Sequence, residues 1–268
     1  MNTKSPIRLE RDGAIATLTV DQPESMNAIT DEATVDALCA VFDEMQRDTA
    51  VRALIITGAG RVFSSGGNIK HMRDRAGTFA GNAIDVRNGY RRGVQRIPRA
   101  LYELEVPTIA AVNGAAIGAG LCLALACDIR YAAAGAKLGA PFVKLGMHAG
   151  MGGTYLLPEA VGPAHARDLL LTGRVVDADE ALRLGLVSRV IEPDAFRSEV
   201  LATAAGIAGT APIASRLTKL ALADGGHADL ESCLQWEALA QPVTLATADL
   251  QEGIRAAREK RRPVFEGR

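Results

Sequence analysis

The sequence predicts an α/β fold followed by a helical C-terminal region. Three patterns support this: a hairpin at the start, short β-branched runs that alternate with helical periodicity up to about Asp177, and amphipathic segments almost without strands after it. Of the 268 residues, 48% are hydrophobic, which is enough to bury a sizeable core. We expect an α/β core over residues 1–195 and a helical region over residues 196–268.

The first elements are two strands and a helix. The segment IRLERDGAIATLTVD alternates apolar and polar positions around Asp12-Gly13, which is typical of a tight β-hairpin. Apolar residues then recur at helical spacing over residues 35–45, with Thr30 as the expected N-cap.

Two buried strands follow, and each leads into a glycine-rich loop. The run VRALIITG precedes GAGRVFSSGGN, and TIAAVNG precedes AAIGAG. GAGLCLALACD then predicts a helix, and IRYAAA predicts another strand. Both loops place backbone N–H groups at loop-to-helix junctions, where small residues allow a polar oxygen to come close. Two such groups converging on one oxygen would make an oxyanion hole, which stabilises charge developing on a carbonyl.

The C-terminal third is predicted to be mainly helical. Only VSRVIE has the pattern of a short strand, whereas APIASRLTKLALADG, DLESCLQWEALA and TADLQEGIRAAREKR are amphipathic. In the first half of the chain, AIDVRNGYRRGVQRI also predicts a helix.

Charge and cysteine content exclude several classes of partner. The 30 Lys and Arg residues against 31 Asp and Glu give a formal net charge of −1, so no overall field favours nucleic acid or an anionic membrane. The four cysteines lack CxxC spacing, which argues against zinc and fits a reducing compartment. Neither a signal peptide nor a spanning apolar run is apparent. We expect a cytoplasmic protein without a metal site.

The common catalytic motifs are absent. The sequence contains no GxxxxGK[ST], HExxH or GxSxG. GAAIGAG follows a strand and opens a helix, but its glycines do not give the GxGxxG of dinucleotide-binding folds. The chemistry therefore has to come from a less common arrangement.

Five segments in order resemble the crotonase superfamily, the enoyl-CoA hydratases and isomerases. They are DQPESMNAIT, LIITGAGRVFSSGGNIKHM, TIAAVNGAAIGAGLCLALACDIRYAAAGAKLGAPFVKLGMHAGMGGTYLLPEAVG, LLLTGRVVDADEALRLGLVSRVI and EGIRAAREKRRPVFEG. The resemblance implies a spiral of ββα units, a helical C-terminal trimerisation region, and a homotrimer or a dimer of trimers. It also implies lyase or isomerase activity in fatty acid metabolism on an acyl-CoA thioester, with coenzyme A entering as part of the substrate and no separate cofactor.

The resemblance assigns the two oxyanion donors to the backbone N–H groups of Gly67 and Ala119. Relatives often have glycine at the second position, but alanine keeps the main-chain donor. The positions matched to coenzyme A binding are Met26, Ala28, Ser64, Gly66, Asn68 and Ile69, together with Lys260 and Phe265, which match tail positions that often reach a neighbouring subunit's ligand. Asn68 replaces the usual aspartate and keeps a capping side chain. For the tail pair, a basic helix end and a packed anchor are an equally good explanation.

The positions of the two hydratase glutamates carry Cys122 and Phe142. Hydration needs one carboxylate to activate water and one to protonate the α-carbon, and phenylalanine cannot transfer a proton. Cys122 lies among apolar residues, which favours a buried packing thiol over a thiolate. Gly150 stands where other relatives place a reactive aspartate. We therefore count Cys122 and Phe142 as substrate contacts and expect very low crotonyl-CoA hydratase activity.

His148 is the remaining titratable candidate for proton transfer, because imidazole serves as acid or base near neutral pH. A histidine packed at a turn and satisfied by backbone partners is the equally weighted alternative. Tyr90, Arg87 and Arg91 lie on a segment that matches the family's variable acyl-pocket wall. Tyr90 can supply a phenolic hydrogen bond, although a partly exposed helix surface is favoured, because Arg and Tyr commonly keep polar tips in water.

Two functions remain open from the sequence. One is an enzyme that stabilises a thioester enolate at Gly67 and Ala119 and transfers protons through a non-standard group. The other is a catalytically silent acyl-CoA-binding protein in which Phe142 fills the space of the hydratase water.

Overall fold

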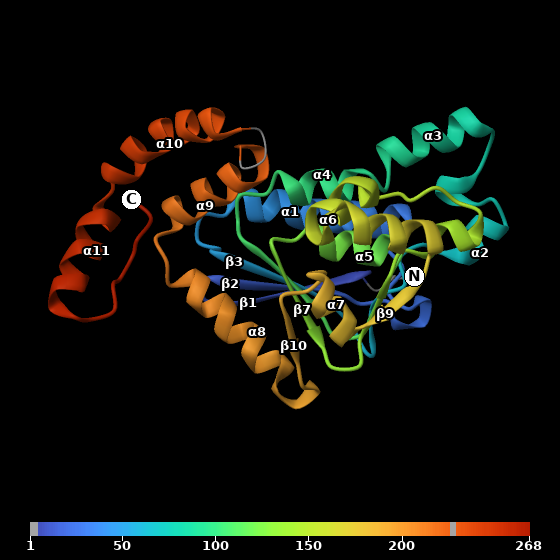
Figure 1. The fold of residues 1–268 in the computed structure, drawn as a ribbon, viewed down its shortest axis with the longest axis horizontal. Helices are drawn as coiled ribbons and strands as arrows, with labels where there is room; N and C mark the ends of the chain where they lie inside the picture. Colours follow the sequence, from blue (N-terminus) through green and yellow to red (C-terminus); the bar gives the residue numbers. More distant parts are fainter. Residues whose placement is uncertain (1–4, 226–228) are drawn as a thin grey trace.

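The computed structural model describes residues 5–225 and 229–268, and its strands form two sheets (Figure 1). The larger sheet has the order β1-β2-β3-β5-β7-β10 and the smaller one β4-β6-β8-β9. The larger sheet contains β1 (Ile7–Asp12), β2 (Ile15–Val20), β3 (Ala53–Gly58), β5 (Thr108–Val112), β7 (Ile129–Ala133) and β10 (Arg189–Ile191). The smaller sheet contains β4 (Val62–Ser64), β6 (Ala115–Ile117), β8 (Lys137–Gly139) and β9 (Val175–Asp177).

The helices cover the sheets and continue into the C-terminal region. They are α1 (Glu32–Arg47), α2 (Ile69–Arg73), α3 (Ala83–Arg92), α4 (Arg96–Tyr102), α5 (Ala119–Leu125), α6 (Gly153–Thr172), α7 (Ala178–Leu184), α8 (Pro193–Ala208), α9 (Pro212–Leu220), α10 (Leu230–Leu245) and α11 (Ala248–Glu259). Short helical turns are η1 (Pro23–Ser25), η2 (Gly77–Phe79), η3 (Pro141–Leu145) and η4 (Ala221–Gly225).

The predicted hairpin, first long helix and buried strands of the first half are confirmed. β1 and β2 pair antiparallel across the turn at Gly13, and β2, β3, β5, β7 and β10 then pair in parallel. The predicted N-cap of the first long helix is wrong by one residue, because Asp31 holds that position. The Thr30 hydroxyl instead accepts the N–H of Asn68 at 3.0 Å. The Thr30 side chain therefore makes a tertiary hydrogen bond to the Gly67 loop instead of the helix cap that the local pattern predicted.

Three successive units each place one strand in each sheet and then a helix. β3 and β4 precede α2, β5 and β6 precede α5, and β7 and β8 precede η3 and α6. This repeat confirms the predicted spiral of ββα units. β4 and β6 lie inside the two glycine-rich segments that we predicted as loops. The repeat matters for function, because it stacks the loops after β4 and β6 beside one another.

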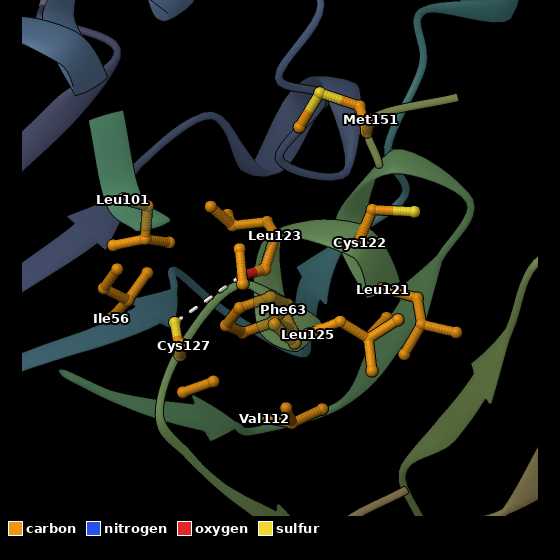
Figure 2. Close-up of a cluster of buried hydrophobic side chains, with 14 of the residues drawn as sticks. Ile56, Phe63, Leu101, Val112, Leu121, Cys122, Leu123, Leu125, Cys127 and Met151 are labelled. Carbon is orange, nitrogen blue, oxygen red and sulfur yellow. Dashed lines mark hydrogen bonds between the residues drawn. The ribbon is translucent and has the colours of Figure 1, made fainter. Parts of the chain in front are cut away.

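The central strands of the larger sheet, β3 and β5, are buried on both faces. Successive residues point to opposite faces of a strand, so Leu54 and Ile56 of β3 join a cluster with α1, α4 and α5, part of which Figure 2 shows. Ala53 and Ile55 join a second cluster with Phe196 and other residues of α8. This burial on both faces explains why the parallel strands are continuous apolar runs.

The transition from core to projecting helices lies after α8. Its residues Phe196, Val200 and Ala204 pack on the sheet, so this helix, which spans the predicted boundary between residues 195 and 196, packs on the core. Helices α10 and α11 extend away from the body (Figure 1). In the part of the chain that the structure describes, no single helix is long and apolar enough to cross a membrane, and one bent pair, Pro193–Ala208 with Pro212–Ala223, passes by length and composition only.

Candidate active site

The two glycine-rich loops pack backbone against backbone. A Cβ atom on Gly66, whose φ is +83°, would lie 2.4 Å from the Ile117 carbonyl oxygen and 2.6 Å from the Ala119 nitrogen. A Cβ atom on Gly120 would lie 2.3 Å from the Ser64 carbonyl oxygen. Larger residues at these two glycines would force the loops apart. The glycines therefore bring Gly67 and Ala119 to the wall of one cavity.

The backbone N–H groups on either side of Gly67 donate hydrogen bonds within the protein, whereas the N–H of Gly67 does not. The N–H of Gly66 donates to the Ser64 hydroxyl at 3.0 Å, and the N–H of Asn68 donates to the Thr30 hydroxyl at 3.0 Å. Gly67 and Ala119 donate to no acceptor among the described residues. Ala119 is the first residue of α5, where no preceding helical turn supplies an acceptor. Two residues with unpaired N–H groups thus line the same space.

That space is a cavity of about 200 Å³ with mainly apolar walls. It is lined by Thr30, Ser65, Gly67, Ile69, Met72, Phe79, Tyr90, Ile117, Gly118, Ala119, Pro141, Phe142, Lys144, Leu145 and Met147. In this described lining there is no Asp, Glu or His, and Lys144 is exposed at the rim. Carbonyl polarisation by the two N–H groups is the chemistry that this arrangement supports most directly.

Tyr90 lies on the partly exposed helix surface favoured from the sequence, and it also lines the cavity. It is half-buried, whereas Arg87 and Arg91 of the same helix are exposed. A Cβ atom on Gly150 would lie 2.0 Å from the Tyr90 hydroxyl oxygen, so the hydroxyl occupies the room that a side chain at residue 150 would need. Burial, and to a lesser degree Cys122, raises the pKa of Tyr90. Tyr90 is therefore a neutral hydrogen-bond donor at neutral pH.

Cys122 lies behind the cavity rather than in its wall. Its side chain is 1% exposed, and Figure 2 shows it among the buried apolar residues of α5. The thiol donates to the Gly150 carbonyl oxygen with a 3.4 Å separation, and burial raises its pKa to about 12. These observations agree with the packing thiol favoured from the sequence. Phe142, by contrast, lines the cavity next to Gly118.

His148 does not line the cavity. Its side chain is exposed and makes no hydrogen bond to the described residues, so the backbone partners of the alternative interpretation are also missing. The loop from Gly146 to Gly150 carries it past the site and turns it outward. Its catalytic role stays a prediction that the geometry of this single chain does not support.

The residues predicted to bind coenzyme A fall into two groups. Ile69 is 62% exposed at the cavity mouth and Met26 is 57% exposed with a left-handed backbone. Ala28 and Ser64 are buried behind the loop: Ala28 pairs with Gly66, and the Ser64 hydroxyl donates to the Asn27 carbonyl at 2.7 Å. The second group positions the Gly67 loop from behind.

Asn68 caps α2 as predicted. Its side chain accepts the N–H of His71 at 3.2 Å, and its amide nitrogen donates to Asp31 Oδ2 at 3.4 Å. The other carboxylate oxygen of Asp31 lies 2.7 Å from His71 Nδ1. Because the cap fixes the first turn of α2, it also fixes the direction in which the Gly67 N–H points.

Lys260 and Phe265 lie in the C-terminal tail and do not line the cavity of their own chain. Lys260 is the exposed C-cap of α11, and the Phe265 ring approaches a Cβ position on Gly253 to 3.6 Å. The packed-anchor interpretation accounts for Phe265 within one chain, and the reach of either residue to a neighbour's ligand stays a prediction.

Met72 and Phe79 are cavity residues that the sequence analysis missed. They come from α2 and η2, which have five and three residues, too short for periodicity to reveal a buried face. A Cβ atom on Gly67 would lie 2.3 Å from the Met72 terminal methyl carbon, so this side chain covers the donor loop.

Residues 10–268 match the family model described as enoyl-CoA hydratase/isomerase. The chain belongs to the enoyl-CoA hydratase/isomerase family. It is 40% identical over 263 residues to a crotonyl-CoA hydratase of Syntrophomonas wolfei, covering 97% of each chain, and 37% identical over 263 residues to an (E)-benzylidenesuccinyl-CoA hydratase of Thauera aromatica, covering 98% and 99%. The crystal structure of an enoyl-CoA hydratase from Bacillus anthracis superposes with a TM-score of 0.92 at 32% identity, covering 98% of this chain and 100% of that one. Membership of the enoyl-CoA hydratase/isomerase family confirms the resemblance and the predicted fold class.

Proposed function

We propose that this member of the family processes a short-chain acyl-CoA thioester through an enolate stabilised at Gly67 and Ala119. The observation that carries the proposal is the pair of unpaired N–H groups facing one apolar cavity. Pockets that enclose whole drug-sized ligands measure roughly 300–1,000 Å³, so a cavity of about 200 Å³ fits the acyl part while the coenzyme A part extends outside. Family membership supports the thioester as the ligand.

We further propose that standard hydration of crotonyl-CoA is slow. The described lining of the cavity has no carboxylate, and the positions matched to the hydratase glutamates carry Cys122 and Phe142. The relatives are named as hydratases, so they lend no support to slow hydration or to the silent alternative. This part of the proposal rests on the residues of the cavity alone.

We also propose that the protein assembles as a homotrimer or a dimer of trimers through its C-terminal helices. α10 exposes an unusual number of large apolar side chains for a helix that extends from the body: Leu230, Leu234, Leu239, Val243 and Leu245. Light scattering coupled to size-exclusion chromatography is expected to give three or six times the 28.2 kDa of one chain. A cytoplasmic location stays a prediction.

The decisive experiment compares binding with turnover. Isothermal titration with crotonyl-CoA, butyryl-CoA and an aryl-CoA thioester is expected to show binding, with free coenzyme A binding more weakly than a thioester. Hydration of crotonyl-CoA is expected to stay far below about 10 per second, a typical enzymatic turnover. A rate near or above that value would overturn the slow-hydration proposal. Failure of every thioester to bind would overturn the acyl-CoA proposal itself, and binding without any reaction would favour the silent binding protein.

A further inference from the structure

The Tyr90 hydroxyl lies where a side chain on residue 150 would otherwise be. The two residues come from α3 and from the loop that precedes α6, and a Cβ atom on Gly150 would lie 2.0 Å from the hydroxyl oxygen and 3.1 Å from the ring carbon that bears it. Gly150 does not have a positive φ, so its backbone does not itself require glycine. The missing side chain at residue 150 is what makes room for the hydroxyl.

The hydroxyl is available to a ligand. The Tyr90 hydroxyl makes no hydrogen bond with any residue that the structure describes, and its oxygen is not among the buried side-chain atoms that lack a partner, so it is reachable from outside the packed core. A half-buried hydroxyl next to an apolar cavity normally finds a partner. The nearby titratable groups are the buried Cys122 thiol of α5 and the exposed Lys144 at the rim, and neither pairs with it.

We propose that Tyr90 is the group that exchanges a proton with the α-carbon of the bound thioester. This inference rests on the proposed function, because the thioester carbonyl must be held by Gly67 and Ala119. Tyr90 lines the same cavity as both donor residues, and the described lining offers no carboxylate or imidazole for the same task. The missing side chain of Gly150 and the orientation of Tyr90 together replace a conventional acid or base.

The step balances with water as the only other reactant. In one direction the phenolic O–H bond breaks, its proton forms a C–H bond at the α-carbon, and the enolate electron pair returns from oxygen to restore the thioester carbonyl. In the other direction the phenol first gives its proton to water, and the phenolate oxygen then removes an α-proton while the electron pair of the C–H bond moves into the enolate, whose oxygen the two N–H groups stabilise. Exchange of the phenolic hydrogen with water then transfers solvent hydrogen to the substrate.

The test follows deuterium incorporation at the α-carbon of butyryl-CoA in heavy water. The wild-type protein is expected to accelerate exchange over the free thioester. Tyr90→Phe is expected to lose about 100-fold or more of that rate, the usual contribution of a positioned acid or base. Its dissociation constant for butyryl-CoA is expected to stay within about threefold of wild type, because the ring that lines the cavity remains.

Two further variants make the result specific. Gly150→Ala keeps every functional group but places a methyl group against the hydroxyl, so it is expected to reduce exchange strongly while the protein stays folded. Tyr155→Phe makes the same chemical change at a tyrosine that is 52% exposed and outside the cavity, so it is expected to leave exchange unchanged.

The outcomes separate this inference from the proposed function. If the wild-type protein does not bind butyryl-CoA, the proposed function fails and this inference fails with it. If it binds but does not accelerate exchange, or if Tyr90→Phe exchanges as fast as wild type, the role of Tyr90 is wrong while acyl-CoA binding stands. A loss in His148→Ala with none in Tyr90→Phe would assign the proton to His148 instead.

Discussion

Backbone N–H groups converge at two places in this molecule, the cavity and the C-terminal tail, and their bonding differs. In the tail, carboxylates of α11 accept the N–H groups of Val264, Glu266 and Gly267 at 3.0, 2.7 and 2.9 Å. At the cavity, Gly67 and Ala119 have no such acceptor in the described chain. An unpaired backbone N–H away from water is costly, and most are paired within the fold. The unpaired N–H groups at the cavity therefore indicate a ligand site, whereas the paired N–H groups of the tail hold the tail against α11.

The largest expected effect comes from removing one of the two unpaired N–H groups at the cavity. Ala119→Pro deletes the N–H at the first position of α5, where proline is accepted in helices. Loss of one oxyanion donor is expected to lower the α-proton exchange rate of saturating butyryl-CoA about 100- to 1,000-fold. Ala119→Gly keeps the donor and is expected to stay within a few-fold of wild type. An Ala119→Pro rate near wild type, in a folded protein by circular dichroism, would remove Ala119 from the proposed hole.

An intermediate effect is expected from removing a carboxylate that accepts the backbone N–H groups of the tail. Asp249 is 3% exposed and accepts two N–H groups, so Asp249→Ala is expected to lower the free energy of unfolding by about 1–3 kcal/mol in urea titration. Asp179 is the matched control, because it holds the same second position in α7 but is exposed. Asp179→Ala is expected to change stability by less than about 0.5 kcal/mol. Equal effects of the two changes would mean that the tail bonds contribute no stability.

The smallest expected effect is a pH response confined to the tail. The Arg261 guanidinium, then the Val264 N–H and Arg255, hold the pKa of Glu252 below its usual value of 4.5. A carboxyl group with a lowered folded-state pKa stabilises the fold fully above its ordinary pKa, and this contribution is lost as the pH falls below it. Hydrogen exchange of residues 262–268, corrected for intrinsic rates, is expected to accelerate below about pH 4.5. In Glu252→Gln this pH response should be absent. If the variant responds as wild type does, another group controls the tail.

The sequence predicted the long elements and missed the short ones for a physical reason. β3 and β5 are buried on both faces, so they appear as uninterrupted apolar runs. β4 and β6 have three residues each, and alternation cannot be recognised over so short a length. The helix predicted over residues 83–97 is two helices, because Gly93 adopts a non-helical backbone between α3 and α4.

The two loops of the site were recognisable from the sequence, whereas the direction of its side chains was not. Glycine-rich junctions after two strands indicated backbone N–H groups open to a ligand, and the family resemblance assigned them to Gly67 and Ala119. Whether Tyr90 points inward depends on the room left by Gly150 in a distant segment, a tertiary property that helical periodicity does not contain. His148 was singled out for its chemistry, but the loop that carries it turns it outward.

The close approach of the two loops at Gly66 and Gly120 has a consequence for how the family's chemistry can diversify. The proposed charge-stabilising part of the site is made of main chain, so most side-chain replacements around it leave the two donors where they are. Tyr90, Phe142 and Met72 can then change the shape and acidity of the cavity independently. A directed-evolution experiment that keeps the glycines and randomises only these walls would therefore search among reactions of one common enolate.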